Sequence, residues 1–138
     1  MAKPANGAAR PSIILSETDA DRLSALAVRA EKQSPVVAGL LLDEIARARI
    51  VPDRKLPPTA VAIGSTVEFI DEARDARRTV SLVLPADADI AAGRISVLTP
   101  IGAGLIGLSI GQTILWPDRD GHERRLRILE VRAAVLAE

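Results

Sequence analysis

The chain has 138 residues, of which 48% are hydrophobic and only 1% aromatic, so we expect one small domain with an aliphatic core. Its 18 basic and 18 acidic residues give a formal net charge of +0, which argues against sequence-specific binding of nucleic acid, and the absence of cysteine excludes disulfides and thiolate metal sites. No apolar run approaches the ~20 residues that span a bilayer, so we expect a cytoplasmic protein without membrane contact.

The first predicted elements are two helices joined by a short turn. Residues 1–11 contain no hydrophobic stretch and are predicted to form a flexible tail. Ser16 is placed to cap a first helix, and Ser34 followed by Pro35 is typical of the start of a second. The spacing of apolar residues predicts a short antiparallel hairpin, a coiled coil, over residues 12–51. Each helix should have about 16 residues, which gives a length of roughly 25 Å.

The two helices each carry an apolar stripe that should face the partner helix. In the second helix the inward residues are Val37, Leu40, Leu41, Ile45 and Ala48. Asp43, Glu44, Arg47 and Arg49 are expected on the outer side. Ile13, Ile14 and Leu15, just before the first cap, are apolar and pack either on the hairpin or on another chain.

Residues 52–59 and 60–138 are predicted to be a linker and a sheet domain. Three prolines within residues 52–59 cannot continue a helix, so this segment links the two parts. Five later segments have the character of strands: STVEFID, RTVSLVLP, RISVLT, QTILW and RRLRILEVRA. We therefore expect an α+β fold in which an antiparallel five-stranded sheet carries one short helix after its third strand.

The segment PIGAGLIGL contains Gly102, Gly104 and Gly107 at the G-x-G-x-x-G spacing of a dinucleotide-binding turn. That motif requires a substantial helix and a second parallel strand after the glycines. Here Gly111 and another predicted strand follow within a few residues, so a βαβ crossover has no room. The glycines instead indicate a short helix packed tightly against the sheet, and no cofactor is expected.

Other candidate catalytic or metal-binding residues are isolated. His122 is the only histidine and lies in a predicted turn, so we expect it to be a solvated turn residue. Asp87 and Asp89 resemble a fragment of a cation-binding loop, but the glycine and the last glutamate of a calcium loop are missing. We therefore predict that the protein is not an enzyme and holds no metal.

The segment RISVLTPIGAGLIGLSIGQTI, which follows a hairpin and a linker, resembles the Gre transcript-cleavage factors. It resembles more closely their shortened relatives, the regulators of nucleoside diphosphate kinase (Rnk), and SPVVAGLLLDEIARARIV is similar to their second helix. The resemblance covers about Ser12 to Val131 and implies an FKBP-like fold for residues 60–138. Gln112 is a departure, because an acid commonly follows the glycine at this point in the family.

The resemblance also implies binding to RNA polymerase core at the secondary channel, the pore that leads to the active site. In Gre factors the C-terminal domain grips the channel rim. Aligned by the resemblance, the corresponding strand-to-helix corner here is formed by Leu98, Thr99, Pro100 and Ile101.

The hairpin tip of Gre factors carries two acids to the catalytic magnesium. Here the tip is formed by Glu31, Lys32 and Gln33, and Glu31 is its only acid. One carboxylate beside an ammonium group is a poor metal ligand. Together with the shortness of the hairpin, this predicts a Gre-type factor that does not stimulate transcript cleavage.

Two other functions stay open. Direct regulation of nucleoside diphosphate kinase needs only a protein surface. A prolyl isomerase would suit an FKBP-like fold but needs an aromatic-lined pocket, and the only aromatic residues, Phe69 and Trp116, lie on different predicted strands.

Overall fold

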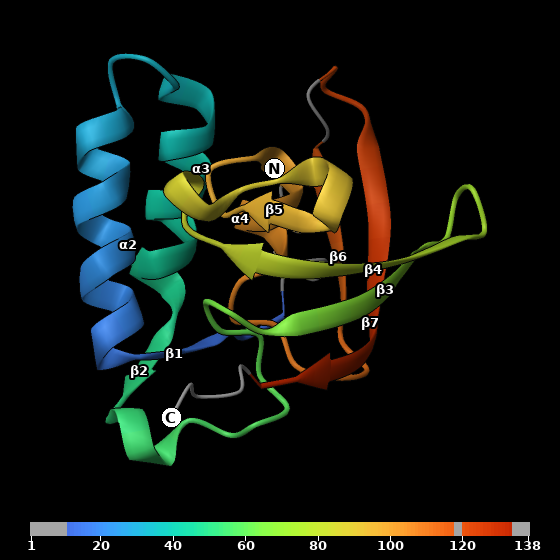
Figure 1. The fold of residues 1–138 in the computed structure, drawn as a ribbon, viewed down its shortest axis with the longest axis horizontal. Helices are drawn as coiled ribbons and strands as arrows, with labels where there is room; N and C mark the ends of the chain where they lie inside the picture. The colour runs from blue at the N-terminus through green and yellow to red at the C-terminus, as the bar shows by residue number, and fades with distance from the viewer. Residues whose placement is uncertain (1–10, 118–119, 134–138) are drawn as a thin grey trace, which may run out of the picture.

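The computed structural model describes residues 11–117 and 120–133. In this α+β structure a pair of helices packs beside a curled sheet of five strands (Figure 1). Most of the predicted flexible tail, residues 1–10, and residues 118–119, just before the predicted turn that holds His122, lie outside the described residues.

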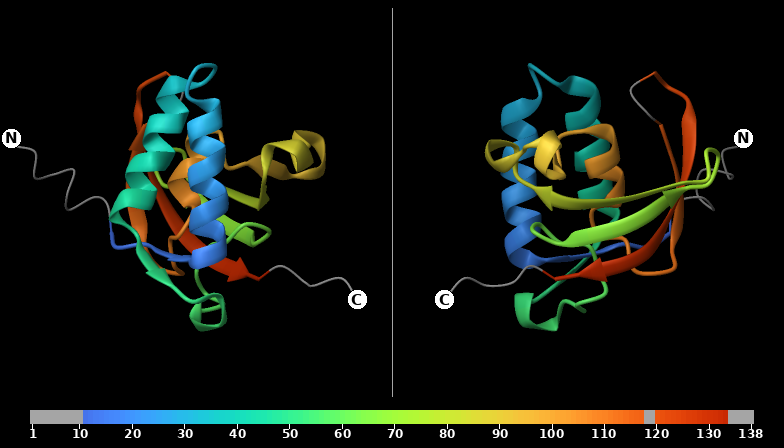
Figure 2. Two further views of the ribbon diagram at one scale, coloured as in Figure 1. Left: turned by 90° about the vertical axis from the view of Figure 1, so that its left-hand side faces the viewer. Right: turned by 45° about the vertical axis from the view of Figure 1, so that its right-hand side comes forward.

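The two predicted helices are α2, Glu17–Ala30, and α3, Pro35–Arg47, which lie side by side and run in opposite directions (Figures 1 and 2). The Ser16 hydroxyl accepts a hydrogen bond from the Asp19 amide at 3.1 Å and so caps α2 as predicted. At 14 and 13 residues, the helices are shorter than expected, with a length of about 20 Å.

A short two-stranded ladder, absent from our expectations, closes the base of this helix pair. Strand β1, Ile14–Ser16, enters α2, and strand β2, Arg49–Val51, leaves α3. The two strands pair in parallel. Of the two alternatives for the apolar residues before α2, the structure shows packing within the same chain, because Ile13 and Leu15 are 2% and 1% exposed.

The five-stranded sheet has the order β5-β4-β3-β7-β6. Its strands fall on the five predicted segments: β3 Thr66–Asp71, β4 Ala76–Val83, β5 Arg94–Ser96, β6 Thr113–Pro117 and β7 Glu123–Arg132. The expectation of a wholly antiparallel sheet is wrong, because β5 runs parallel to β4. The connection over residues 84–93 contains two 3-10 turns, η2 Pro85–Asp87 and η3 Ile90–Ala92, and is long enough to return the chain for a parallel pairing.

One continuous core joins the helices to the sheet. Leu23 and Leu41 of the helix pair are fully buried in the same cluster as Val67, Leu82 and Ile128 of the sheet. The third helix, α4, Pro100–Leu105, follows β5 and contacts both α3 and β6. The helix pair is therefore anchored to the sheet by aliphatic burial.

The expected outward position of Glu44 is wrong. Its side chain is fully buried, and it accepts hydrogen bonds from Arg47 Nε at 3.0 Å and from an Arg47 terminal nitrogen at 2.7 Å. The other terminal nitrogen of Arg47 donates to the Pro11 carbonyl oxygen at 2.6 Å. Because the guanidinium satisfies this carboxylate, α3 can bury an acid against the segment that precedes β1.

The proline-rich segment 52–59 is tied to the start of α2. It contains a short 3-10 turn, η1 Asp53–Lys55. The Asp53 carboxylate accepts hydrogen bonds from the Thr18 hydroxyl and, at 3.0 Å, from the Thr18 amide. These bonds stabilise the ionised carboxylate and lower the pKa of Asp53 below its ordinary value.

Candidate functional site

The corner where β5 gives way to α4 is held by a dense set of local hydrogen bonds. The Ser96 hydroxyl accepts from the Leu98 amide at 2.9 Å. The Thr99 hydroxyl donates to the Ser96 carbonyl at 2.8 Å and accepts from the Gly102 amide at 3.0 Å, so Thr99 is the N-cap of α4. Pro100 occupies the first position of the helix, where its missing amide hydrogen costs no bond. The backbone of the corner is consequently fixed.

Two of the motif glycines bring α4 close to its neighbours. A Cβ on Gly102 would lie 2.2 Å from the Ser96 carbonyl oxygen, and one on Gly104 would lie 2.8 Å from the Trp116 ring. Trp116 lies beneath α4, 1% exposed, and its indole nitrogen donates to the Pro100 carbonyl. The glycines therefore serve close packing, as predicted.

Gly107 has a separate role, in a turn. Its φ is +82°, in the region that favours glycine, and its amide donates to the Val61 carbonyl at 2.9 Å. α4, which includes the first two motif glycines, has only six residues. A dinucleotide site, which needs a longer helix after the glycine turn, has no such helix here.

The structure places the four predicted corner residues together. Leu98, Thr99, Pro100 and Ile101 are each half-buried, so the corner presents part of every side chain to solvent. Pro100 and Ile101 line a groove of about 300 Å³ together with Ile95 and Ala88. This groove gives the corner an apolar recess.

Ile90 and Arg78 are groove residues that the sequence did not indicate. Ile90 of η3 is 82% exposed and lines the groove. Arg78 of β4 lines it as well and stacks over the Phe69 ring, with 5.9 Å between the guanidinium carbon and the ring centre. A lone isoleucine among small and acidic residues, in ADADIAAG, was the available signal for the first.

The predicted hairpin tip forms the turn between α2 and α3. Glu31, Lys32 and Gln33 are all exposed there. Apolar residues flank them, because Val28 is 58% and Val36 is 74% exposed. The tip therefore combines one acid, one base and two exposed aliphatic side chains.

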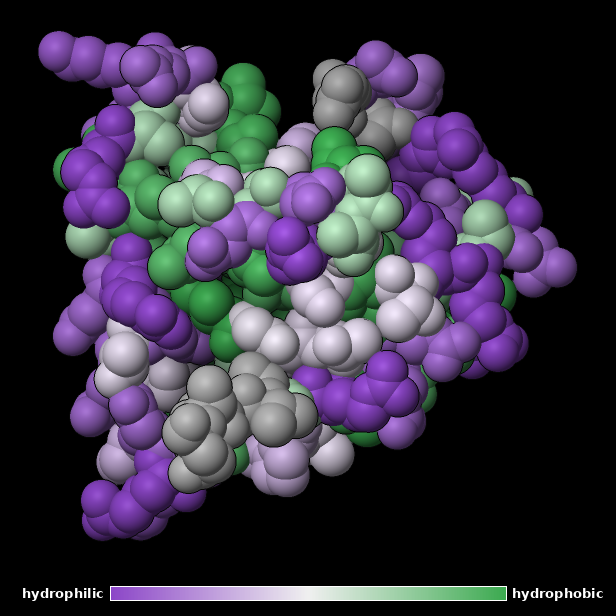
Figure 3. All heavy atoms as spheres, viewed as in Figure 1, coloured by the Kyte–Doolittle hydropathy of each residue, from purple (hydrophilic) through white to green (hydrophobic). Residues whose placement is uncertain are grey.

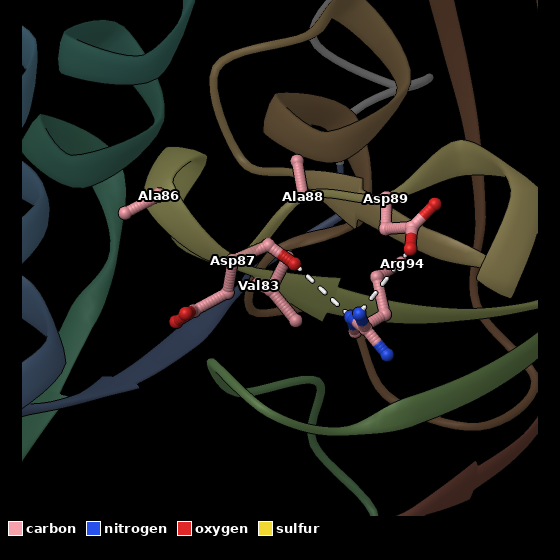
Figure 4. A pocket seen from close by; sticks show the side chains of 6 residues that line it. All are labelled: Val83, Ala86, Asp87, Ala88, Asp89 and Arg94. Carbon is pink, nitrogen blue, oxygen red and sulfur yellow. Dashed lines mark hydrogen bonds and ion pairs between the residues drawn. The ribbon is translucent and has the colours of Figure 1, made fainter.

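The hollow beside η2 and η3 contains the two aspartates considered as a cation loop (Figure 4). Arg94 donates to the Asp87 carbonyl at 3.1 Å and to the Asp89 carboxylate at 3.4 Å. Asp89 also accepts from the Ala92 amide at 3.3 Å. The Asp87 carboxylate points away from Asp89 (Figure 4), so the two do not converge on a common point.

Within residues 11–117 and 120–133, no group of three or more histidine, cysteine or acidic residues is arranged to hold a metal ion. Phe69 and Trp116 are both 1% exposed and belong to the core, so they line no open pocket. None of the described helices is both long and apolar enough to cross a bilayer.

Gln112 links the start of β6 to the segment before β1. Its side-chain oxygen accepts from the Ser109 amide at 2.9 Å, and its side-chain nitrogen donates to the Ser12 carbonyl at 3.1 Å. A carboxylate could make the first bond but has no hydrogen for the second. The bond to Ser12 therefore gives a physical reason for a glutamine, instead of the acid common in the family, at position 112.

Two family models match consecutive parts of the chain. Residues 11–51 match the Rnk N-terminus, and residues 56–133 match the C-terminal domain of the transcription elongation factors GreA/GreB.

Individual relatives agree with these matches. The regulator of nucleoside diphosphate kinase of Escherichia coli strain K12 is 31% identical over 122 residues, covering 88% of this chain and 90% of that protein. The transcription elongation factor GreA of Methylobacterium sp. strain 4-46 is 34% identical over 113 residues, covering 76% and 72%. Among solved structures, a GreA/GreB elongation factor from Nitrosomonas europaea is 39% identical with a TM-score of 0.68, covering 88% of this chain and 98% of that one.

Proposed function

Because the chain belongs to the family of Rnk and the GreA/GreB elongation factors, we propose that it regulates transcription by binding RNA polymerase core at the secondary channel, without stimulating transcript cleavage. The observation that carries this proposal is the pair of family matches, which together span residues 11–51 and 56–133. In this proposal the protein acts in the cytoplasm and is not an enzyme. We also propose that residues 12–51 form a coiled coil and that residues 60–138 have an FKBP-like fold.

The corner at the start of α4 is the proposed grip on the polymerase. Pro100 and Ile101 border an apolar groove, and their backbone is fixed by the Thr99 cap and by Trp116. A rigid, partly apolar corner loses little conformational entropy on docking, which favours binding.

The absence of cleavage stimulation is proposed from the tip. Recruitment of a second metal ion needs several carboxylate oxygens close together. The exposed tip offers Glu31 alone, next to Lys32, and the flanking exposed side chains are Val28 and Val36. The helices of 13 and 14 residues also limit the reach of the tip to about 20 Å.

A second candidate function is regulation of nucleoside diphosphate kinase. It is favoured by one observation: the E. coli relative that bears this name aligns with 88% of the chain. This function needs only a protein surface, and the same corner or tip would supply it.

Crosslinking to purified polymerase core, with and without a Gre-factor competitor, tests the proposal. We expect a crosslink that the competitor removes, and no increase of cleavage in backtracked complexes. Capture from lysate provides the comparison between candidates, because the partner recovered should be polymerase subunits rather than the kinase. Cleavage stimulation by the wild-type protein would contradict the argument from the tip.

A further inference from the structure

One face of α2 is turned toward a groove instead of the core. The core-facing residues are Ala20, Leu23 and Ala27. A second set, at the i, i+3, i+4, i+7 spacing of one helical stripe, lines the groove: Arg22, Ala25, Leu26 and Arg29. Helix α2 therefore packs on the core with one face and lines the groove with another.

The opposite wall of the groove is the segment that leaves β4. It is formed by Leu84, Pro85 and Ala86, and the space enclosed is about 500 Å³. Figure 3 shows hydrophobic side chains gathered between the hydrophilic outer edge of α2 and the sheet. The groove has an apolar lining and room for several aliphatic side chains.

The charged residues that line this groove are both basic. Arg22 forms an ion pair with Asp19 at 2.8 Å and stays 47% exposed, whereas Arg29 forms no ion pair with any described residue. The two arginines are seven positions apart, which places them about 10 Å from each other along the axis of α2. Among the residues that the structure describes, no carboxylate lines the groove.

We propose that this groove binds an acidic amphipathic helix of RNA polymerase, an inference that rests on the proposed function. A helix lying along α2 has the same rise per residue, so two carboxylates seven residues apart on it would face both arginines. Aliphatic side chains between them would pack on Leu26 and Leu84, as in other helix-in-groove contacts.

Nucleic acid fits this groove less well than a protein helix. A phosphate backbone is bound by a run of cations, and the chain as a whole has a formal net charge of +0. The apolar lining of the groove would leave a phosphate backbone poorly solvated, whereas the same lining can pack against the apolar face of a protein helix.

Binding of labelled protein to purified polymerase core, measured by fluorescence anisotropy over a series of salt concentrations, tests the inference. Arg29→Glu should weaken binding at least tenfold and flatten its salt dependence, because an interfacial ion pair is lost and replaced by repulsion. Ala25→Glu, at an exposed helix position, should weaken binding as well. Arg54→Glu, on the exposed turn η1, is the matched control and should bind like wild type.

The two hypotheses fail in different ways. If Arg29→Glu and Ala25→Glu both bind like wild type while Pro100→Asp is weakened, the groove inference is overturned and the proposed function stands. If wild type does not bind polymerase, both are overturned. Melting temperatures of all variants show whether a loss of binding comes from unfolding.

Discussion

The Trp116 indole lies directly against the backbone of Gly104, so close that a Cβ on Gly104 would sit 2.8 to 2.9 Å from three of its ring carbons. The ring has no space to retreat, because it is 1% exposed and its nitrogen is bound to the Pro100 carbonyl. This contact couples the core of the sheet to the corner proposed to dock on polymerase.

Gly104→Ala should therefore destabilise the protein by about 1 to 3 kcal/mol, the usual cost of overpacking a core. Chemical denaturation followed by the fluorescence of Trp116, the only tryptophan, measures this. Gly39→Ala is the matched control: Gly39 lies within α3 with nothing within 4 Å of an added Cβ, so alanine should stabilise by about 0.5 to 1 kcal/mol. Equal effects of both changes would contradict the close contact.

Leu41→Ala should lower the free energy of unfolding by about 2 to 5 kcal/mol, because Leu41 is fully buried in the core between the helix pair and the sheet. Val36→Ala, on the same helix at 74% exposure, should change it little. Urea denaturation of the two variants measures the difference, and a loss below roughly 0.5 kcal/mol for Leu41→Ala would be incompatible with its burial.

Glu44→Ala should destabilise by about 1.5 to 3 kcal/mol, the range for a hydrogen bond to a charged group, because Arg47 loses both bonds to the carboxylate. Asp43→Ala, at the exposed neighbouring position, should have a small effect. Thermal melts at neutral pH distinguish the two. A result in which both variants melt like wild type would show that Glu44 is solvated.

Asp53 should titrate below the ordinary aspartate value of 3.8, since the Thr18 hydroxyl and amide donate to its ionised form. A lowered pKa in the folded state contributes stability that is present above the unfolded-state value and lost as the pH falls through the folded-state value. The advantage of wild type over Asp53→Asn should thus shrink below about pH 4. Carboxyl NMR titration measures the pKa directly.

Thr18→Val is the control for the cause of that shift. It removes the hydroxyl donor, the largest contribution, so the pKa of Asp53 should rise toward its ordinary value. An Asp53 pKa that is the same in wild type and Thr18→Val would assign the shift to another group.

Pro100→Asp should weaken polymerase binding at least tenfold, about 1.4 kcal/mol, while the fold is kept. An aspartate is tolerated at the first position of a helix, and the Trp116 bond is made by the main-chain carbonyl, which survives the change. Pro58→Asp, at an exposed position of the proline-rich segment 52–59, makes the same substitution away from the corner. Binding by both variants like wild type would place the docking surface elsewhere.

The segments with clear periodicity were predictable. The helices that begin after Ser16 and Ser34, and all five strands of the large sheet, were located from local patterns, because caps, prolines and alternation act within a few residues. Ser34 stands at the N-cap position of α3, but unlike Ser16 its side chain makes no capping hydrogen bond. The pairing of strands that are distant in the sequence has no comparable local sequence pattern. The parallel arrangement of β4 and β5 depends on the path of residues 84–93, and β1 and β2 are only three residues each.

The proposed surfaces were only partly predictable. The corner residues at 98–101 stood out through the glycine motif and the family resemblance. Ile90 and Arg78 join them only through the path of the β4–β5 connection. The spacing of Glu44 and Arg47 allows a local ion pair, but the burial of Glu44 and the bond from Arg47 to Pro11 depend on the tertiary fold, so the sequence indicated a surface acid.

The parallel pairing of β1 with β2 places the two ends of the helix pair side by side, with Ser16 opposite Val51. An element whose ends are joined in this way can change length without disturbing its base. Whole turns added to both helices at the tip end, beyond the buried residues, would move the tip outward by about 5.4 Å for each turn, while the ladder and the sheet stay in place. The same ladder and sheet can therefore support helix pairs of different length, and the distance from the sheet to the tip can be changed by insertion alone.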